Sequence, residues 1–208
     1  MIASRRRVLG FTTGLLLAGT GWSWAQSPEA TSAARLMDDL MWNRGPIGGP
    51  FALIDHTGKP RTDLDFRGKL LLIYFGYSYC PDVCPTDLQQ IGLAVDRLGS
   101  AGGEVQPLFI TLDPERDTVA HLADYVPLFH PRLIGLSGSA EQIQRVALAY
   151  KVYYAKYPSG SADYVVDHSS FIYLVDAIGK YIGFFPPGTM ADRMIEIIKL
   201  HLREGSKK

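Results

Sequence analysis

Two cysteines four residues apart are the side chains of this sequence that are best suited to chemistry. Cys80 and Cys84 are the only cysteines of the chain, and they lie in residues 76–86, which read GYSYCPDVCPT. If this segment were helical, both sulfurs would lie on one face and could converge on one ion. Soft thiolates suit Cu(I), Zn(II) or cluster iron. Structural zinc needs four protein ligands and would have to recruit histidines or carboxylates, whereas a mononuclear copper site needs only a third donor.

The cysteine segment lies between a predicted strand and a predicted helix. Residues 70–75 form a continuous apolar run that is typical of a buried strand. After the segment, apolar side chains recur at roughly helical spacing as far as Leu98. Pro85 has a fixed φ that suits the first helical position, so we expect the helix to begin just after Cys84. The partial positive charge at a helix N-terminus favours thiolate over thiol, so the pair is expected to be reactive or metal-binding.

The third metal donor is sought among the five histidines. Four of them lie where a solvated surface position is expected: His56, His121, His130 and His201. His168 differs because it belongs to the segment 164–170, immediately before the apolar run 171–175. A residue that enters a central strand can face the turn that ends the neighbouring strand. His168 is therefore the candidate donor, and a hydrogen-bonded structural histidine is the alternative.

A charged segment, DPERDT at residues 113–118, follows another predicted strand at the same edge of the sheet. We expect this segment to cap the next helix, with Asp117 or Thr118 at the N-cap, rather than to take part in catalysis. No catalytic side chain is predicted anywhere in the chain.

Strands and helices alternate through most of the sequence. Strands are expected at residues 51–54, 70–75, 105–112, 133–136, 152–157, 171–175 and 181–185. Helices are expected from just after Cys84 to Leu98 and at residues 119–126, 139–150 and 190–202. This alternation implies parallel pairing, and the hairpin near the end adds antiparallel strands. The prediction is an α/β, thioredoxin-like fold: a mixed central sheet flanked by helices, with an N-terminal strand or hairpin extension. The cysteines then lie at the carboxyl end of a central strand.

Composition favours one globular domain and excludes a nucleic-acid partner. The chain has 208 residues, of which 47% are hydrophobic, enough for a sizeable core. Its 21 basic side chains balance 21 acidic ones. Because residues 1–25 hold three arginines and no acid, the remainder has 18 basic and 21 acidic side chains. No basic stripe is present, so nucleic acid is not expected as a partner. We expect a monomer.

The first 25 residues read as a targeting segment. Three arginines, Arg5 to Arg7, precede a mostly apolar stretch, and Ser23-Trp24-Ala25 offers a small-x-small cleavage site. The paired arginines are similar to a twin-arginine signal, and an uncleaved anchor is the alternative. The stretch is shorter than the ~20 apolar residues of a spanning helix, so we favour cleavage. Either form predicts export to the periplasm or to the periplasmic face of the inner membrane.

The chain is expected to divide into four parts. They are a signal peptide or N-terminal anchor at 1–25, a leader or linker at 26–47, the thioredoxin-like domain at 48–203 and a C-terminal tail at 204–208. Export suggests a disulfide as the first reading of two cysteines. A bridge across a gap of three residues removes little chain entropy, however, so it would stabilise the fold weakly. A functional pair is the better interpretation.

Three segments in order resemble the Sco/SenC copper-chaperone family. They are GYSYCPDVCP at residues 76–85, TLDPERDT at 111–118, and VDHSS at 166–170 followed by YLVD at 173–176. The resemblance spans about residues 48–202 and implies a thioredoxin-like fold. It also implies a protein that binds copper, as Cu(I) and also as Cu(II), and helps to assemble the copper centre of cytochrome c oxidase.

Carried onto this chain, the resemblance implies that Cys80, Cys84 and His168 are the copper ligands. The implied partners are the copper-bearing subunit of cytochrome c oxidase and other copper or thiol-redox proteins. Cu(I) is soft, and two thiolates with one imidazole suit its low coordination number. The resemblance implies a metal carrier rather than an enzyme.

Two enzymes compete with this interpretation. A thiol–disulfide oxidoreductase would keep the recipient cysteines reduced, but its usual motif is Cys-x-x-Cys rather than Cys-x-x-x-Cys. Thioredoxins also place a proline opposite their thiols, where this chain has residues 167–170 without a proline. A peroxiredoxin-like peroxidase ranks third: residues 84–86 are similar to its reactive segment, but Pro81 stands where that family has a threonine.

Overall fold

The computed structural model of the chain describes residues 28–160 and 163–205. The expected signal or anchor at residues 1–25 lies outside this part, as do residues 206–208 at the end of the expected tail. No helix within the described residues is long and apolar enough to cross a membrane.

Within the described residues, seven strands form one mixed sheet in the order β2-β1-β5-β4-β3-β8-β9. Its strands are β1 (Ala52–Asp55), β2 (Pro60–Thr62), β3 (Leu70–Gly76), β4 (Val105–Thr111), β5 (Ile134–Ser137), β8 (Ile172–Val175) and β9 (Tyr181–Phe185). The three strands β3, β4 and β5 run parallel, whereas β8 is antiparallel to β3 and β9 is antiparallel to β8. The expected mixed thioredoxin-like sheet is confirmed.

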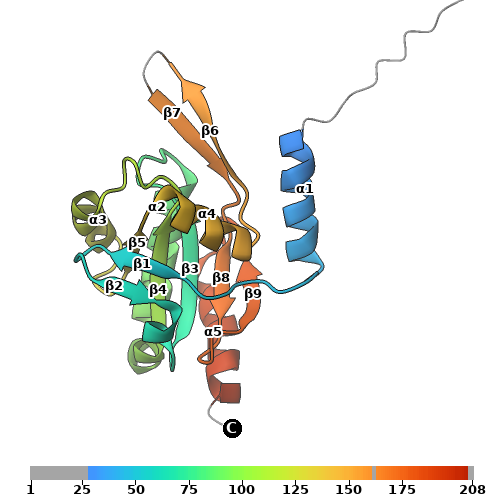
Figure 1. Cartoon of the computed structure of the whole chain (residues 1–208). Helices are drawn as coiled ribbons and strands as arrows, with labels where there is room; N and C mark the ends of the chain where they lie inside the picture. The colour runs from blue at the N-terminus through green and yellow to red at the C-terminus, as the bar shows by residue number, and fades with distance from the viewer. Residues whose placement is uncertain (1–27, 161–162, 206–208) are drawn as a thin grey trace, which may run out of the picture.

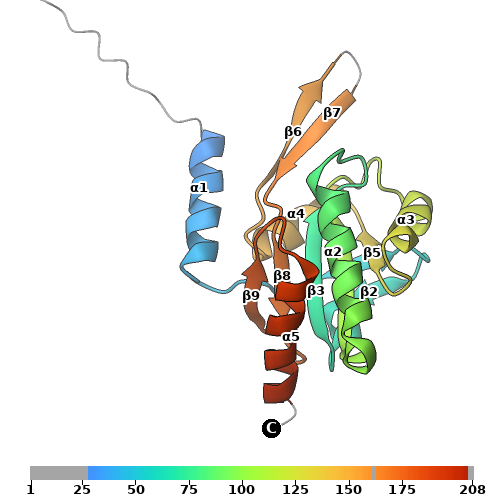
Figure 2. The same cartoon turned by 180° about the vertical axis from the view of Figure 1, so that it is seen from behind.

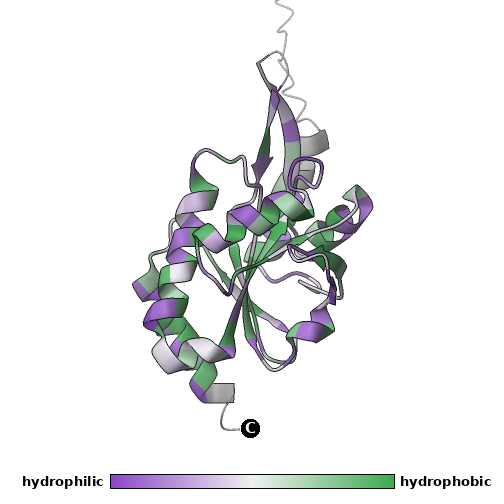
Figure 3. Ribbon diagram, turned by 90° about the vertical axis from the view of Figure 1, so that its left-hand side faces the viewer, coloured by the Kyte–Doolittle hydropathy of each residue, from purple (hydrophilic) through white to green (hydrophobic). Residues whose placement is uncertain are grey.

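Helices cover both faces of this sheet. They are α2 (Val83–Arg97), α3 (Val119–Tyr125), α4 (Ala140–Ala149) and α5 (Ala191–Gly205), with short 3-10 turns η1 (Asp63–Phe66), η2 (Gly99–Glu104) and η3 (Val126–Leu128). A further helix, α1 (Pro28–Met41), stands apart from the sheet (Figure 1). Helices α2 and α5 lie side by side on one face (Figure 2), and α4 lies over the other (Figure 1). Figure 3 shows the hydrophobic central strands between helices of mixed colour. The core therefore lies on both sides of β3, β4 and β8.

Strand β3 is central because its sequence is apolar throughout. All seven of its residues are buried. A strand that is covered on both faces reads as a continuous hydrophobic run rather than an alternating one, which is why the periodicity predicted it well. The strand ends at Gly76, and the chain then forms the loop that leads to the cysteines.

Helix α2 begins earlier than the sequence suggested. Its first residue is Val83 and its N-cap is Asp82, so Cys84 lies inside the first turn rather than before the helix. Pro85 is compatible with this start, because the first four N–H groups of a helix have no intrahelical partner and the N–H that proline lacks is one of them.

A separate two-stranded hairpin projects from the body of the protein (Figure 1). It lies beside the loop of residues 77–82 between β3 and α2, which contains Cys80 and is called the cysteine loop below. It consists of β6 (Tyr154–Ser159) and β7 (Asp163–His168). The sequence predicted a strand at 152–157 followed by a loop, so the second strand was missed. The side chains of β7 are mostly exposed or half-buried, and this gives little hydrophobic pattern. His168 is consequently the last residue of β7, not the first residue of β8.

The expected N-terminal hairpin is present. Strands β1 and β2 pair antiparallel, and β1 also pairs with β5, which places the hairpin at the edge of the sheet. Its turn is fixed by the buried Asp55, whose carboxylate accepts hydrogen bonds from the backbone of Thr57 at 2.8 Å and of Lys59 at 3.0 Å. Gly58 adopts a φ of 82°, which glycine reaches without strain.

Candidate metal centre

The two cysteines lie at different depths, Cys80 in the loop after β3 and Cys84 in the helix that follows it. Cys84 is fully buried in the first turn of α2, whereas Cys80 is half-buried at the edge of the loop. Both are free thiols. Gly76 at the end of β3 allows Cys84 to come this close, because a Cβ at position 76 would lie 2.9 Å from the Cys84 Sγ. The loop thus presents the Cys80 thiol to the surface, and the first turn of α2 keeps the Cys84 thiol buried.

His168 lies against the buried thiol. Its Nε2 is 3.6 Å from the Cys84 Sγ, although 84 residues separate the two in sequence. The Nδ1 lies 3.1 Å from the Val166 carbonyl oxygen, which can accept its proton, and this contact favours the tautomer with a free electron pair on Nε2. The Ser170 hydroxyl is 3.3 Å from the same Nε2. The imidazole is therefore oriented with its acceptor nitrogen toward Cys84.

The three candidate ligands form two pairs that share Cys84. Cys80 and Cys84 lie close enough for each to shift the pKa of the other, and the Cys84 Sγ contacts His168. Across residues 28–160 and 163–205, no three His, Cys, Asp or Glu side chains already surround one point closely enough to hold a metal. The structure thus brings the predicted residues together pairwise, and the ligand assignment stays a prediction.

The two thiols share one proton unequally. The pKa of Cys80 is lowered to about 5, chiefly because its sulfur accepts a hydrogen bond from the Cys84 thiol, with further support from the backbone N–H groups of Cys84 and Asp82. The pKa of Cys84 is raised, because its thiol donates that hydrogen bond and because it is buried. Cys80 is consequently a thiolate at neutral pH and Cys84 a thiol, as expected for backbone donors at a helix N-terminus.

Burial also determines the charge of the imidazole. The pKa of His168 is lowered from its ordinary value because desolvation disfavours the protonated ring, although its bond to Val166 opposes this. A neutral imidazole is the form that ligates metals. At neutral pH the centre therefore combines one thiolate, one thiol and one neutral ring.

A buried carboxyl group lies beneath the thiols. Asp87 is fully buried one turn after Cys84 on α2, and its Oδ1 accepts a hydrogen bond from the Gly188 backbone at 2.9 Å. Its Oδ2 has no hydrogen-bond partner among the described residues. Burial raises the pKa of Asp87. The sequence analysis did not single out this residue, although Cys84, Leu88 and Ile91 of the same helix are buried with it.

Asp117 supports the cysteine loop, a role that the sequence did not suggest. It is fully buried, and its carboxylate accepts hydrogen bonds from the Thr111 hydroxyl at 2.6 Å and from the backbone N–H and hydroxyl of Ser78, the former at 3.0 Å. The N-cap of α3 is Thr118, whose side chain accepts the His121 N–H. Thr118 was one of the two expected caps, and Asp117 is instead turned inward.

Of the four histidines that were expected at solvated surface positions, His130 is buried, and His56, His121 and His201 are half-buried. His121 is half-buried, its Nε2 lies 2.7 Å from the Ser78 hydroxyl, and its ring stacks on Tyr79 with centroids 5.1 Å apart. His130 is 6% exposed, and its Nδ1 accepts the Arg132 N–H at 3.0 Å. The contact between His121 and Ser78 joins residues 43 apart in sequence, so no local pattern reveals it.

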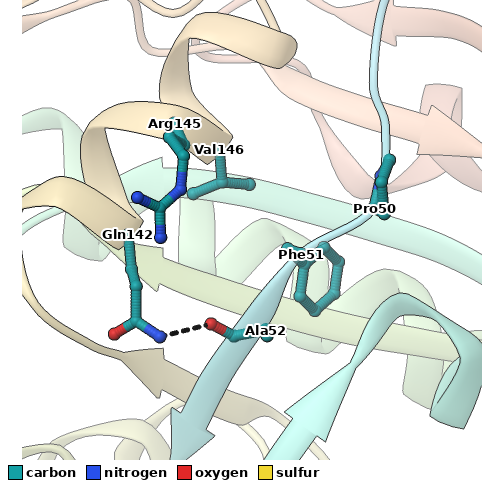
Figure 4. A pocket seen from close by; sticks show the side chains of 6 residues that line it. All are labelled: Pro50, Phe51, Ala52, Gln142, Arg145 and Val146. Carbon is teal, nitrogen blue, oxygen red and sulfur yellow. Dashed lines mark hydrogen bonds between the residues drawn. The ribbon is translucent and has the colours of Figure 1, made fainter.

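Two cavities lie elsewhere and contain none of the candidate ligands. One has a volume of about 290 Å³ between the start of β1 and helix α4 (Figure 4). In this cavity the Gln142 side-chain amide donates to the Ala52 carbonyl at 2.8 Å. The other has a volume of about 330 Å³, and Phe51 lines both. The loop around the thiols is accordingly the place where reactive groups gather.

Comparison with known proteins agrees with this arrangement. Residues 41–203 match the family profile SCO1/SenC. A mitochondrial SCO2 homologue of Bos taurus is 42% identical over 203 residues, which cover 95% of this chain and 76% of the relative. The crystal structure of Arabidopsis thaliana ScoI with copper bound is similar with a TM-score of 0.72 and 42% identity, and the match covers 76% of this chain and 99% of that one. The structure of Bradyrhizobium japonicum ScoI with copper bound is similar with a TM-score of 0.70 and 41% identity, and the match covers 74% of this chain and 99% of that one.

Proposed function

The chain belongs to the SCO1/SenC family, and from this premise we propose that it is a copper chaperone for the assembly of cytochrome c oxidase. One copper ion is its cargo, held by Cys80, Cys84 and His168. The observation that carries the proposal is the 3.6 Å contact between the Cys84 Sγ and the His168 Nε2, which joins the cysteine loop to the hairpin.

The donor set fits a soft, low-coordinate ion. Metal bonds to sulfur and nitrogen of about 2.0–2.3 Å require the ligand atoms to lie within about 4 Å of one another. The Cys84–His168 pair already meets this condition. Cys80 is half-buried, and we propose that its thiolate is the third ligand in three-coordinate binding of Cu(I).

A second candidate function, a thiol–disulfide oxidoreductase acting on recipient cysteines, is favoured by one observation. The accessible Cys80 has the lowered pKa, and the buried Cys84 retains its proton. This asymmetry suits an attacking thiol and a resolving thiol. Formation of a Cys80–Cys84 disulfide would also remove two copper ligands at once, so binding and thiol oxidation would be linked.

The location and boundaries belong to the same proposal. We propose that residues 1–25 direct export to the periplasm or the periplasmic face of the inner membrane, and that residues 48–203 form the copper-carrying domain. The proposed recipient is the copper-bearing subunit of cytochrome c oxidase, which the chain meets as a monomer. Cell fractionation tests the proposed export. The mass of the mature protein tests cleavage, which would remove residues 1–25.

The decisive experiment measures copper retained after loading and desalting. Reduced wild-type protein is expected to keep one copper per chain, and Cys80→Ser, Cys84→Ser and His168→Ala are each expected to lose it. His56→Ala is the matched control, because His56 lies at the β1–β2 turn and contacts Gly135 instead. Full retention in His168→Ala would remove this ring from the ligand set. Efficient disulfide turnover by metal-free protein would place the oxidoreductase first.

A further inference from the structure

Arg116 links the hairpin to the loop that follows β4. Its Nη1 donates to the Asp163 carboxylate at 2.8 Å and to the Tyr164 carbonyl at 3.0 Å, and both partners belong to β7. Its guanidinium also lies 3.7 Å from the centroid of the Tyr164 ring. The Arg116 side chain is only 18% exposed, so its bond to the Tyr164 carbonyl is partly shielded from solvent, whereas Asp163 is exposed. Arg116 therefore holds β7 by two hydrogen bonds and one ring face.

Asp113 fixes Arg116 from the other side. Asp113 is fully buried, and its carboxylate accepts hydrogen bonds from the Arg116 Nε and, at 2.6 Å, from the Tyr164 hydroxyl. Its own N–H donates to Thr111 at the end of β4 at 2.9 Å. Lys156 on β6 adds ion pairs to Asp113 at 3.4 Å and to Glu115 at 2.9 Å. The hairpin is thus tied to a point that is itself anchored in the main sheet.

Arg116 also reaches the cysteine loop. Its guanidinium lies 4.9 Å from the centroid of Tyr79 and 5.7 Å from that of Tyr77, within the range of cation–π attraction. The Tyr77 ring in turn meets the His168 ring edge-on, with centroids 5.9 Å apart. One side chain consequently contacts the loop that carries the cysteines and the strand that carries the histidine.

The hairpin needs such a tie. An isolated two-stranded hairpin is marginally stable, and β6–β7 is not paired with the main sheet. The Ser169 N–H donates to the Tyr153 carbonyl at 3.0 Å and closes the base of the hairpin, and the buried side chain of Val166 packs against the body of the protein. Neither contact specifies the angle at which β7 meets the cysteine loop. The bonds of Tyr164 and Lys156 tie the hairpin to Asp113 and Glu115, whereas Arg116 contacts both β7 and the tyrosines of the cysteine loop.

We propose that Arg116 is a positioning residue that holds His168 against Cys84 by clamping β7 to the cysteine loop. Its consequence for copper rests on the proposed function, whereas the clamp itself exists without metal. Lysine should replace it poorly, because a single ammonium cannot form the planar fork or stack on Tyr164 in the same way. If Arg116 only stabilised the fold, its substitution would lower stability throughout the protein and would leave the rings of Tyr77 and His168 in contact.

The first test uses reduced, metal-free protein and NMR. In Arg116→Gln we expect the contact between the Tyr77 and His168 rings to disappear. Amide exchange in β7 should rise about tenfold or more, the factor set by losing a hydrogen bond to a charged group. The matched control is Arg132→Gln, because Arg132 is another partly buried arginine that donates to the carbonyls of Gly102 and Val105. An unchanged ring contact and unchanged β7 exchange in Arg116→Gln would overturn the proposal.

The second test measures copper retention in Arg116→Gln, His168→Ala and the double variant. The two single variants are expected to lose copper to the same extent, and the double variant to lose no more, because both changes remove one ligand. Additive losses would contradict the positioning role. If His168→Ala retains copper, the ligand assignment fails, and the metal-free NMR test still decides on the clamp. Should Arg116→Gln not fold, Asp163→Ala removes one exposed partner of the clamp and is expected to raise β7 exchange alone.

Discussion

The Asp117 carboxylate accepts two hydrogen bonds from Ser78, one from the backbone N–H and one from the hydroxyl, although 39 residues separate the two in sequence. Asp117 follows β4 and Ser78 precedes Cys80, so this pair joins the ends of two adjacent parallel strands. The position of the cysteine loop thus depends on a buried acid outside it.

Asp117→Ala should therefore destabilise the protein by about 2–4 kcal/mol, because the donors of Ser78 and Thr111 lose their acceptor inside the protein. Urea unfolding of reduced protein measures this. Asp192→Ala is the matched control and is expected to change stability by less than about 1 kcal/mol, since the Asp192–Arg97 ion pair is exposed. Equal effects of the two substitutions would contradict the anchoring role.

The reactivity of Cys80 should depend on pH with a midpoint near 5, the value to which its pKa is lowered. Alkylation of metal-free protein by iodoacetamide, followed by mass spectrometry, measures the rate at each thiol. Cys84→Ala should move the midpoint upward, because the hydrogen bond from Cys84 is the largest cause of the shift. A midpoint that does not move would contradict the shared proton.

The same shift predicts how stability depends on pH. The pKa of Cys80 is lower in the folded than in the unfolded chain, so its thiolate contributes stability that is fully present above the ordinary cysteine pKa. That contribution is lost as the pH falls through about 5. The difference in stability between wild type and Cys80→Ser should accordingly grow from pH 5 upward. Above the ordinary cysteine pKa, the stability of the wild type should fall with rising pH, because the pKa of Cys84 is raised in the folded chain.

Gly76→Ala should displace Cys84 and reduce both stability and copper retention. The added Cβ would lie 2.9 Å from the Cys84 Sγ and 3.0 Å from the Tyr74 ring, and overpacking of this kind costs about 1–3 kcal/mol. Gly103→Ala is the matched control, since a Cβ there meets nothing within 4 Å. Wild-type stability and copper retention in Gly76→Ala would show that the close approach of Cys84 is not required.

Asp87→Asn should make the protein less sensitive to rising pH. Burial raises the pKa of Asp87 in the folded chain, so its stabilising protonated form is complete below the unfolded pKa and is lost as pH rises through the folded pKa. An asparagine oxygen can still accept the Gly188 N–H. Urea unfolding from pH 4 to 8 should therefore show a shallower decline in the variant. A parallel decline would mean that Asp87 is ionised at no significant cost.

The sequence predicted those parts of the fold in which burial gives a regular pattern. The continuous apolar run of β3 and the helical spacing of α2 are examples, and both were found with small errors at their ends. Strand β7 was missed because it lies outside the main sheet and has few buried side chains. Its existence depends on partners in another part of the chain.

The candidate ligands could be proposed from the sequence, whereas the residues that support them could not. Cys80, Cys84 and His168 belong to short recognisable segments, so a resemblance to known proteins points to them as ligands, and this assignment stays a prediction. The contacts of Asp117 and Arg116 join strands and loops that are distant in sequence, and their side chains could equally have capped a helix. Only the fold shows that they face inward.

The division between sheet and hairpin has a consequence for how this protein can vary. If copper binds as proposed, residence time of the cargo and melting temperature are set by different contacts. Substitutions along β6–β7 are expected to change how quickly copper leaves while the thermal transition stays in place. Substitutions of core side chains in β3 or β4 are expected to lower the melting temperature, and Gly76→Ala, which also displaces Cys84, should change both properties. The time for which the cargo stays bound could therefore change while the rest of the fold is unaltered.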